Sequence, residues 1–170
     1  MPSKFHKTVV AGLLELGEDL TRPSKRWKTR FTEVFDGNKT PIKIFNPITR
    51  RLMGWNYYPD AYYVTKVERK FIFEVIDRES TNEIVADYIQ AVLSHAHAII
   101  FVTKPDRAGE VKDIIETLND ILKEDLRIKK RPYRAVFAID PNEFRDLRSV
   151  KRELNRYLER YWYTRRPIKQ

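Results

Sequence analysis

Apolar residues recur three or four positions apart in four stretches of the chain, and this spacing predicts amphipathic helices. The predicted helices cover residues 4–20, 81–96, 108–126 and 142–163. Ser80 or Thr81 can cap the second helix, because a short hydroxyl side chain accepts a hydrogen bond from a free N–H of the first turn.

Five other stretches are dense in Tyr, Phe, Ile and Val, which favours strands. Between residues 51 and 76 they read "RLMGWNYY", "AYYVT" and "FIFEVI", and they predict a three-stranded meander. The run "HAIIFVT" (97–103) is continuously apolar, which is typical of a strand buried on both faces, and "YRAVFAI" (133–139) predicts another buried strand. Residues 21–51, rich in Pro, Thr and Arg, predict a loop that includes some strand.

The elements follow one another as helix, three strands, helix, strand, helix, strand and helix. This order indicates an α/β fold with a mixed central sheet and helices on both faces. A chain of 170 residues is the size of one domain. We therefore expect a single domain over 1–170, with a basic final helix at 142–163 and a tail at 164–170.

Composition excludes several kinds of site. The chain has no Cys, so disulfides, thiolate zinc sites and cysteine nucleophiles are ruled out, and it has only three His. It lacks the glycine-rich loops that cradle phosphates. No apolar run approaches the roughly 20 residues needed to cross a bilayer, so we expect no membrane partner and a cytoplasmic, intracellular protein. A charged fraction of 34% favours a thermophilic source.

Charge is unevenly distributed along the chain. The net charge of +9 is made up of +6 in residues 1–51, −2 in 52–140 and +5 in 141–170. Basic surfaces attract polyanions by neutralising phosphates and releasing counterions. A solvated Lys/Arg-rich surface, as in many thermophile proteins, is the alternative explanation.

Carboxylates interrupt two of the apolar strands. The segment "KVERK" has four charges in five residues and predicts a turn, so that strand residues pair when their numbers sum to about 134. Asp60 then lies opposite Glu74, and two adjacent carboxylates suit Mg²⁺ or Mn²⁺, which prefer oxygen ligands. The alternative is that these acids end a strand or pair with Arg or Lys. It is weaker for Glu74, because a charge on a buried strand is costly unless it is paired or metal-bound.

A proline–aspartate pair, Pro59-Asp60, precedes one strand, the next strand carries Glu74, and a helix and a buried strand follow. This arrangement resembles the PD-(D/E)xK nuclease superfamily, which has the restriction-endonuclease-like fold. The resemblance implies that Asp60 and Glu74 bind a catalytic divalent metal. It also implies a lysine two residues after the second acid, but that position holds Ile76.

The stretch "FEVIDRES" is also similar to the "E-x-D-R" stretch of plasmid replication-relaxation proteins, with one residue inserted. Glu74, Ile76 and Arg78 share a face of a regular strand, so Arg78 can supply a cation near a scissile phosphate. Asp77 is a further candidate metal ligand, provided that a bulge turns it towards Glu74. Gln90 is a catalytic candidate on the polar face of the next helix, where related nucleases often place a glutamine; Asp87 and Ser94 share that face.

Two basic segments are candidates for contact with nucleic acid. The final helix carries Arg145, Arg148, Arg152, Arg156 and Arg160 three or four positions apart, which predicts a cationic stripe. The stripe can equally be a solvated face with pairs such as Glu153 to Arg156. The loop "RPSKRWKTR" is the second segment, and its basic residues are Arg22, Lys25, Arg26, Lys28 and Arg30.

These expectations lead to a first functional hypothesis, a Mg²⁺- or Mn²⁺-dependent DNA endonuclease or exonuclease that hydrolyses phosphodiester bonds. It fits a protein of a thermophilic archaeon or of a viral mobile element, and a homodimer is compatible with it. The main alternative is a catalytically inactive DNA-binding protein that retains the nuclease fold. A third hypothesis is an assembly protein whose basic face binds another protein.

Overall fold

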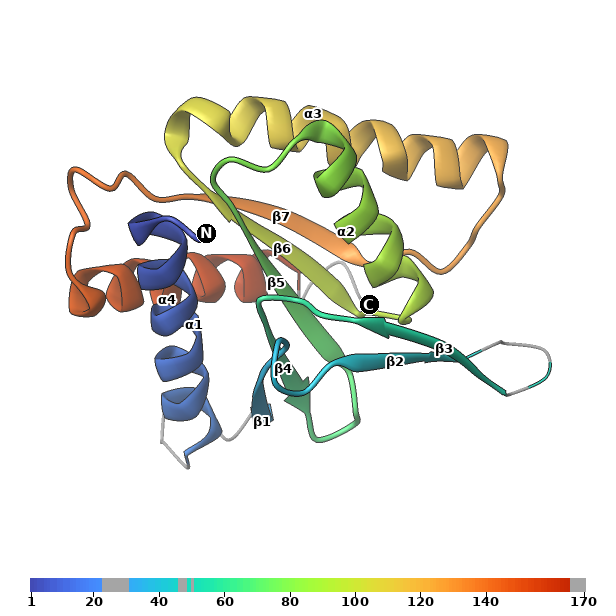
Figure 1. The fold of residues 1–170 in the computed structure, drawn as a ribbon, viewed down its shortest axis with the longest axis horizontal. Helices are drawn as coiled ribbons and strands as arrows, with labels where there is room; N and C mark the ends of the chain where they lie inside the picture. The colour runs from blue at the N-terminus through green and yellow to red at the C-terminus, as the bar shows by residue number, and fades with distance from the viewer. Residues whose placement is uncertain (23–30, 46–48, 50, 166–170) are drawn as a thin grey trace.

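A mixed five-stranded sheet forms the centre of the fold (Figure 1). The computed structural model describes residues 1–22, 31–45, 49 and 51–165, without the side chains of 52, 53 and 162–165. The strands lie in the order β1-β4-β5-β6-β7. Their bounds are Phe31–Asp36 (β1), Ala61–Thr65 (β4), Lys70–Ile76 (β5), Ala98–Thr103 (β6) and Tyr133–Ala138 (β7). β1, β4 and β5 run antiparallel, whereas β5, β6 and β7 run parallel.

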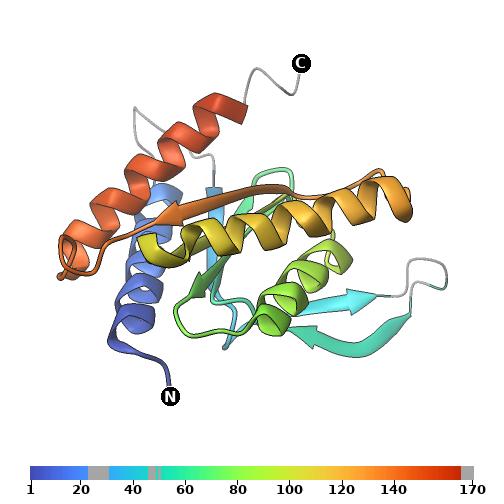
Figure 2. The same ribbon diagram turned by 90° about the horizontal axis from the view of Figure 1, so that it is seen from above.

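Helices cover both faces of this sheet, as the order of elements predicts (Figure 2). On one face, α1 (Lys4–Thr21) and α4 (Leu147–Arg165) pack on Phe71, Phe73 and Val75 of β5. On the other face, α2 (Thr81–Leu93) and α3 (Pro105–Asp120) pack on Ile72 and Ile76, and a π-helical turn, η1 (Ile121–Asp125), extends α3. The fold is therefore an α/β domain with a mixed sheet and helices on both faces.

The predicted meander is wrong in its first strand. The segment Leu52–Tyr57 forms β3, which pairs with β2 (Ile42–Phe45) in a separate two-stranded ribbon. The place beside β4 is taken by β1, which lies in the region predicted to be mostly loop. Strand propensity reports that a segment suits an extended conformation and does not identify its partner, which explains the error.

Other predicted boundaries also change. α2 ends at Leu93, because His95 adopts a left-handed φ of 57° and lies beyond the helix, exposed to solvent. α3 begins at Pro105, since proline is favoured in the first turn, where its missing N–H costs nothing. α4 begins at Leu147, which is exposed, and extends to Arg165, so both ends of this helix differ from the predicted 142–163. β6 is buried throughout, as predicted, but β7 lies at the edge of the sheet and is only partly buried, so the prediction of a second buried strand is wrong.

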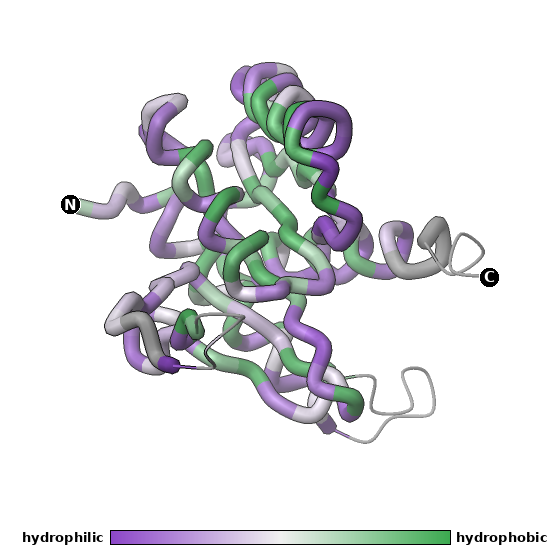
Figure 3. The backbone as a smooth tube through the Cα atoms, turned by 90° about the vertical axis from the view of Figure 1, so that its right-hand side faces the viewer, coloured by the Kyte–Doolittle hydropathy of each residue, from purple (hydrophilic) through white to green (hydrophobic). Residues whose placement is uncertain are grey.

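The core lies between the sheet and its two helical layers. Hydrophobic segments of the backbone trace concentrate along the strands and on the inward sides of the helices (Figure 3). Within the described residues, no helix is long and apolar enough to cross a membrane.

Candidate functional site

The β4–β5 hairpin brings the two predicted carboxylates to one place. Ala61 pairs with Phe73 and Tyr63 with Phe71, so the residue numbers of each pair sum to 134, as predicted. Asp60 lies one residue before the first of these pairs, and its Oδ2 accepts a hydrogen bond from the Val75 N–H at 2.7 Å. The prediction that Asp60 meets the Glu74 segment on the neighbouring strand is confirmed.

A close backbone contact positions Asp60. Gly37 follows β1 and lies against Pro59, so that an added Cβ at Gly37 would be 2.7 Å from the carbonyl carbon of Pro59 and closer still to its oxygen. Only glycine tolerates such an approach. This contact holds the Pro59-Asp60 bend against the end of β1 and directs the Asp60 carboxylate towards β5.

Glu74 is almost completely buried, at 5% exposure, on the sheet face covered by α2. The hydroxyl of Tyr57, at the end of β3, donates a hydrogen bond to Glu74 Oε1 at 2.5 Å. Burial raises the pKa of Glu74 well above its usual value, and the nearby carboxylates of Asp87 and Asp60 raise it further. A hydrogen bond with Asp60 also favours the protonated form of Glu74 and raises its pKa.

Asp87 joins this group from α2. The sequence places it on a polar helix face, but in the structure it is partly buried, and its carboxylate makes no hydrogen bond or ion pair with any other described residue. Burial and the carboxylate of Asp60 raise the pKa of Asp87 to about 7. The position of Asp87 in the sequence predicts only that it lies on the polar face of α2. It does not indicate that Asp87 lies close to Glu74, so Asp87 was not predicted as a site residue.

The other oxygen of Asp60 faces α1. His6 lies in the first turn of α1, which is capped by Ser3, and its Nε2 is 3.1 Å from Asp60 Oδ1. The hydrogen bond with Asp60 raises the pKa of His6, and the charges of Asp60, Glu79 and Asp77 add to this effect. His6 therefore orients Asp60 from the side opposite to Val75. This role was not predicted, because 54 positions separate the two residues in the sequence.

The oxygen atoms at this site suit a hard divalent cation. Among the residues that the structure describes, no three His, Asp or Glu side chains are arranged to hold a metal ion directly. Two carboxylates with several bound waters are nevertheless the usual protein environment of Mg²⁺. Asp60 and Glu74 fit that requirement, and Asp87 adds a negative charge that no described cation balances. We call Asp60, Glu74 and Asp87 the carboxylate cluster.

Asp77, the third predicted metal ligand, lies apart from the cluster. It follows β5, and its Oδ1 is 2.6 Å from the ammonium nitrogen of Lys104, at the start of α3. Burial raises the pKa of Asp77, but the hydrogen bonds with Lys104 and Ser3 and the nearby positive charges together outweigh it and hold the pKa below its usual value. The strand continues without a bulge from Phe71 to Ile76 in its pairing with β6, so Asp77 faces α1 while Glu74 faces α2.

The predicted catalytic partners are not in contact with Glu74. Arg78 lies beyond the end of β5, is exposed, and lines a cavity of about 320 Å³ with His6, Asp77 and Glu79. Gln90 lies on α2 one turn after Asp87, partly buried and without a hydrogen bond to another described side chain. Ile76, at the position where the nuclease family has its lysine, is fully buried among apolar residues.

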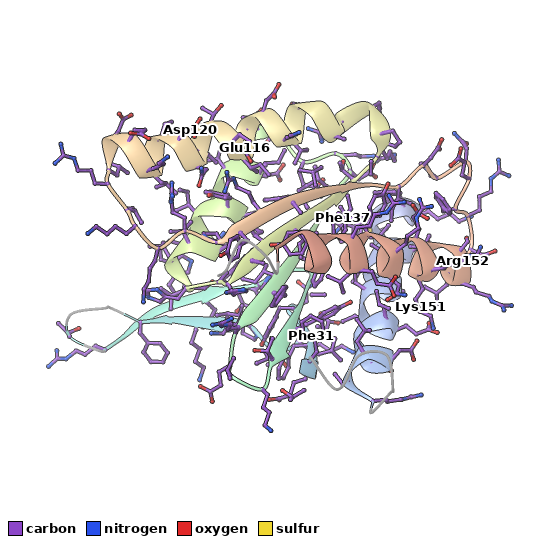
Figure 4. All side chains as sticks on the ribbon, turned by 180° about the vertical axis from the view of Figure 1, so that it is seen from behind. Phe31, Glu116, Asp120, Phe137, Lys151 and Arg152 are labelled. Carbon is purple, nitrogen blue, oxygen red and sulfur yellow. The ribbon has the colours of Figure 1, made fainter. Side chains whose placement is uncertain are left out.

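The arginine stripe lies on the opposite side of the sheet from the cluster. Figure 4 shows α4 in front of the sheet, with Lys151 and Arg152 on it. Arg148, Arg152 and Arg156 are exposed, and Arg156 forms the predicted intrahelical pair with Glu153. The loop candidates Lys25, Arg26, Lys28 and Arg30 lie outside the described residues, and Arg22 follows α1 directly. Contact of either segment with nucleic acid stays a prediction.

Comparison with protein-family models, with curated proteins and with solved structures finds no match to the chain. The candidate function is therefore inferred from the arrangement of the chain's own residues.

Proposed function

We propose that the protein is a divalent-metal-dependent nuclease that hydrolyses phosphodiester bonds in DNA. The observation that carries the proposal is the carboxylate cluster, in which a hairpin places Asp60 beside a buried Glu74, and Asp87 adds a third acid that no described cation balances. Burying carboxylates together is unfavourable without a compensating cation. The order of elements and the Pro59-Asp60 and Glu74 positions support the resemblance to PD-(D/E)xK nucleases.

Each residue of the site would have a separate role in metal binding or in positioning the metal ligands. Asp60 and Glu74 would hold the metal, and Tyr57 and His6 keep the two carboxylates in position through their hydrogen bonds. When bound, Mg²⁺ would lower the pKa of a water and neutralise charge on the phosphate. His6 and Arg78 line the cavity of about 320 Å³ together with the acids Asp77, Glu79 and Glu83, and Arg78 would provide a cation there.

A second candidate function is DNA binding without catalysis. The observation that favours it is Ile76, which is fully buried at the position of the family's lysine. In this case the carboxylate cluster is a remnant of an active site, and the protein holds DNA without cutting it.

The experiment incubates the purified protein with supercoiled, linear and four-way-junction DNA and with RNA, in Mg²⁺, Mn²⁺ or EDTA. Glu74→Gln and Asp60→Asn remove one charge each and nearly preserve shape. Asp113→Asn removes the same charge from an exposed position on α3 and is the matched control. Melting temperatures establish that each variant is folded.

A nuclease cuts in Mg²⁺ or Mn²⁺ but not in EDTA, and both cluster variants lose cutting while the control retains it. Mn²⁺ is then expected to raise the melting temperature of the wild type and not that of Glu74→Gln, because a ligand stabilises only the state that binds it. Salt-sensitive DNA binding without cutting in any metal would reject catalysis and establish the second candidate.

A further inference from the structure

A groove opens on the same side of the sheet as Glu74, at the opposite end of β5. It has a volume of about 920 Å³ and lies between the β2 strand, the first residue of β5 and the C-terminal end of α2. Figure 1 shows the end of α2 next to the β2–β3 ribbon, which projects away from α1.

The charged side chains of the groove are all basic. Lys43 comes from β2, Lys70 from the start of β5 and Lys130 from the segment before β7. No acidic residue is among the described residues that line it, and none of these lysines has an ion-pair partner in the described part of the chain. Three separate segments thus direct unpaired positive charge into one groove, where an anionic partner balances it. We call it the lysine groove.

Apolar side chains stand beside these lysines. Phe45 is 52% exposed and Leu93 is 40% exposed, and both line the lysine groove with the ring of Tyr62. A free anion such as phosphate gains no binding energy from exposed aromatic and aliphatic side chains. A single-stranded nucleic acid gains binding energy from both kinds of side chain, because its backbone follows the cationic side chains while its unpaired bases stack on aromatic rings.

The lysine groove and the carboxylate cluster lie on the same face of the sheet, towards opposite ends of β5. Lys70 and Glu74 lie on the same strand, four residues apart, which corresponds to about 13 Å at the rise of an extended chain. Tyr62 and Glu74 both face the α2 side of the sheet. The arginine stripe of α4, by contrast, lies over the other face.

We propose that the lysine groove binds a single-stranded segment of nucleic acid and directs its backbone towards the carboxylate cluster. This inference rests on the proposed function for what happens at the cluster, but binding in the groove does not require cutting. Lys43, Lys70 and Lys130 contact phosphates, and Phe45 provides the stacking surface. The sequence analysis missed this surface because its lysines are isolated in the sequence and are gathered only by the fold.

The test measures the binding of a fluorescent single-stranded oligonucleotide of about 12 nucleotides, a length within the range of known single-strand sites. EDTA is present so that no cutting occurs, and anisotropy is recorded over a series of salt concentrations. The variant Lys43→Gln/Lys70→Gln/Lys130→Gln is compared with Arg148→Gln/Arg152→Gln/Arg160→Gln, which removes the same charge from α4. Melting temperatures verify folding.

The groove variant is expected to bind about ten-fold or more weakly, and the slope of log K against log salt is expected to fall by about 2, because three phosphate contacts are lost. The α4 variant keeps most of the slope. Phe45→Ala is expected to weaken single-strand binding by about ten-fold, through lost stacking. The assignment is overturned when the α4 variant loses more affinity than the groove variant, or when wild-type protein prefers duplex by ten-fold.

The two proposals fail separately. A wild-type protein that binds single strands through the lysine groove but cuts nothing in any metal supports the groove and rejects the nuclease. A protein that cuts DNA, and whose groove variant binds and cuts as well as the wild type, rejects the groove and leaves the nuclease standing.

Discussion

Replacing Asp87 by asparagine is expected to stabilise the protein at alkaline pH and to leave it unchanged in acid. Asp87 lies close to Asp60 and Glu74, and its carboxylate has no hydrogen-bond partner among the described residues. The substitution therefore removes a charge at nearly constant volume and breaks no described hydrogen bond. Asp113→Asn, on the exposed face of α3, makes the same chemical change away from the cluster.

The direction in which stability changes with pH follows from the number of protons bound in the folded and unfolded states. The pKa of Asp87 rises from 3.8 to about 7 on folding, so between these values the folded protein binds a proton that the unfolded chain lacks. Stability must then fall as pH rises, by about 1.4 kcal/mol for each pH unit across this window. The rise in pKa by about 3 corresponds to about 4 kcal/mol lost once the pH exceeds 7. This value is an upper bound on the gain that Asp87→Asn can show.

The measurement is urea unfolding at several pH values from 4 to 8, with EDTA present, for the wild type, Asp87→Asn and Asp113→Asn. We expect the Asp87→Asn curve to meet that of the wild type near pH 4 and to lie above it at pH 8, while Asp113→Asn follows the wild type throughout. A difference between Asp87→Asn and the wild type that is the same at every pH would refute the reasoning, as would a loss of stability at pH 8.

Three further substitutions test how the site is built, each by urea unfolding. Gly17→Ala is expected to cost about 1–3 kcal/mol, because the new Cβ would collide with Val34 where α1 crosses the sheet; an unchanged midpoint would mean that α1 moves away freely. Tyr57→Phe is expected to cost about 1–3 kcal/mol, because buried Glu74 loses a hydrogen-bond donor; a neutral result would show that water replaces the hydroxyl. Ser80→Ala is expected to cost about 1 kcal/mol by removing the capping box of α2, and an equal midpoint would contradict that.

The sequence pattern predicted correctly those features that depend on residues close to one another in the sequence. The charged turn of the β4–β5 hairpin sets its register, and the register places Asp60 against the Glu74 segment. The capping residue of α2 and the fully buried β6 strand were likewise predictable from composition and spacing. Turns, helix caps and apolar strands are each determined by a few consecutive residues, so they can be recognised in the sequence.

Strand partners were not predictable in the same way. β3 has strong strand propensity, but its partner is β2 and not β4, and the vacant place in the sheet is filled by β1. Which strands meet depends on how the chain buries both of its apolar faces at once. This is a property of the whole fold and not of any one segment.

The sequence by itself determined that the protein is an α/β domain, and that two carboxylates lie beside each other on neighbouring strands. Only the tertiary structure decided what surrounds them, because Asp87, Tyr57 and His6 come from three different elements, α2, β3 and α1, and the packing of these elements brings the side chains together. It likewise separated Asp77 from the cluster by pairing it with Lys104. Burial and electrostatic environment are long-range properties, and they decide which of several acids can act together.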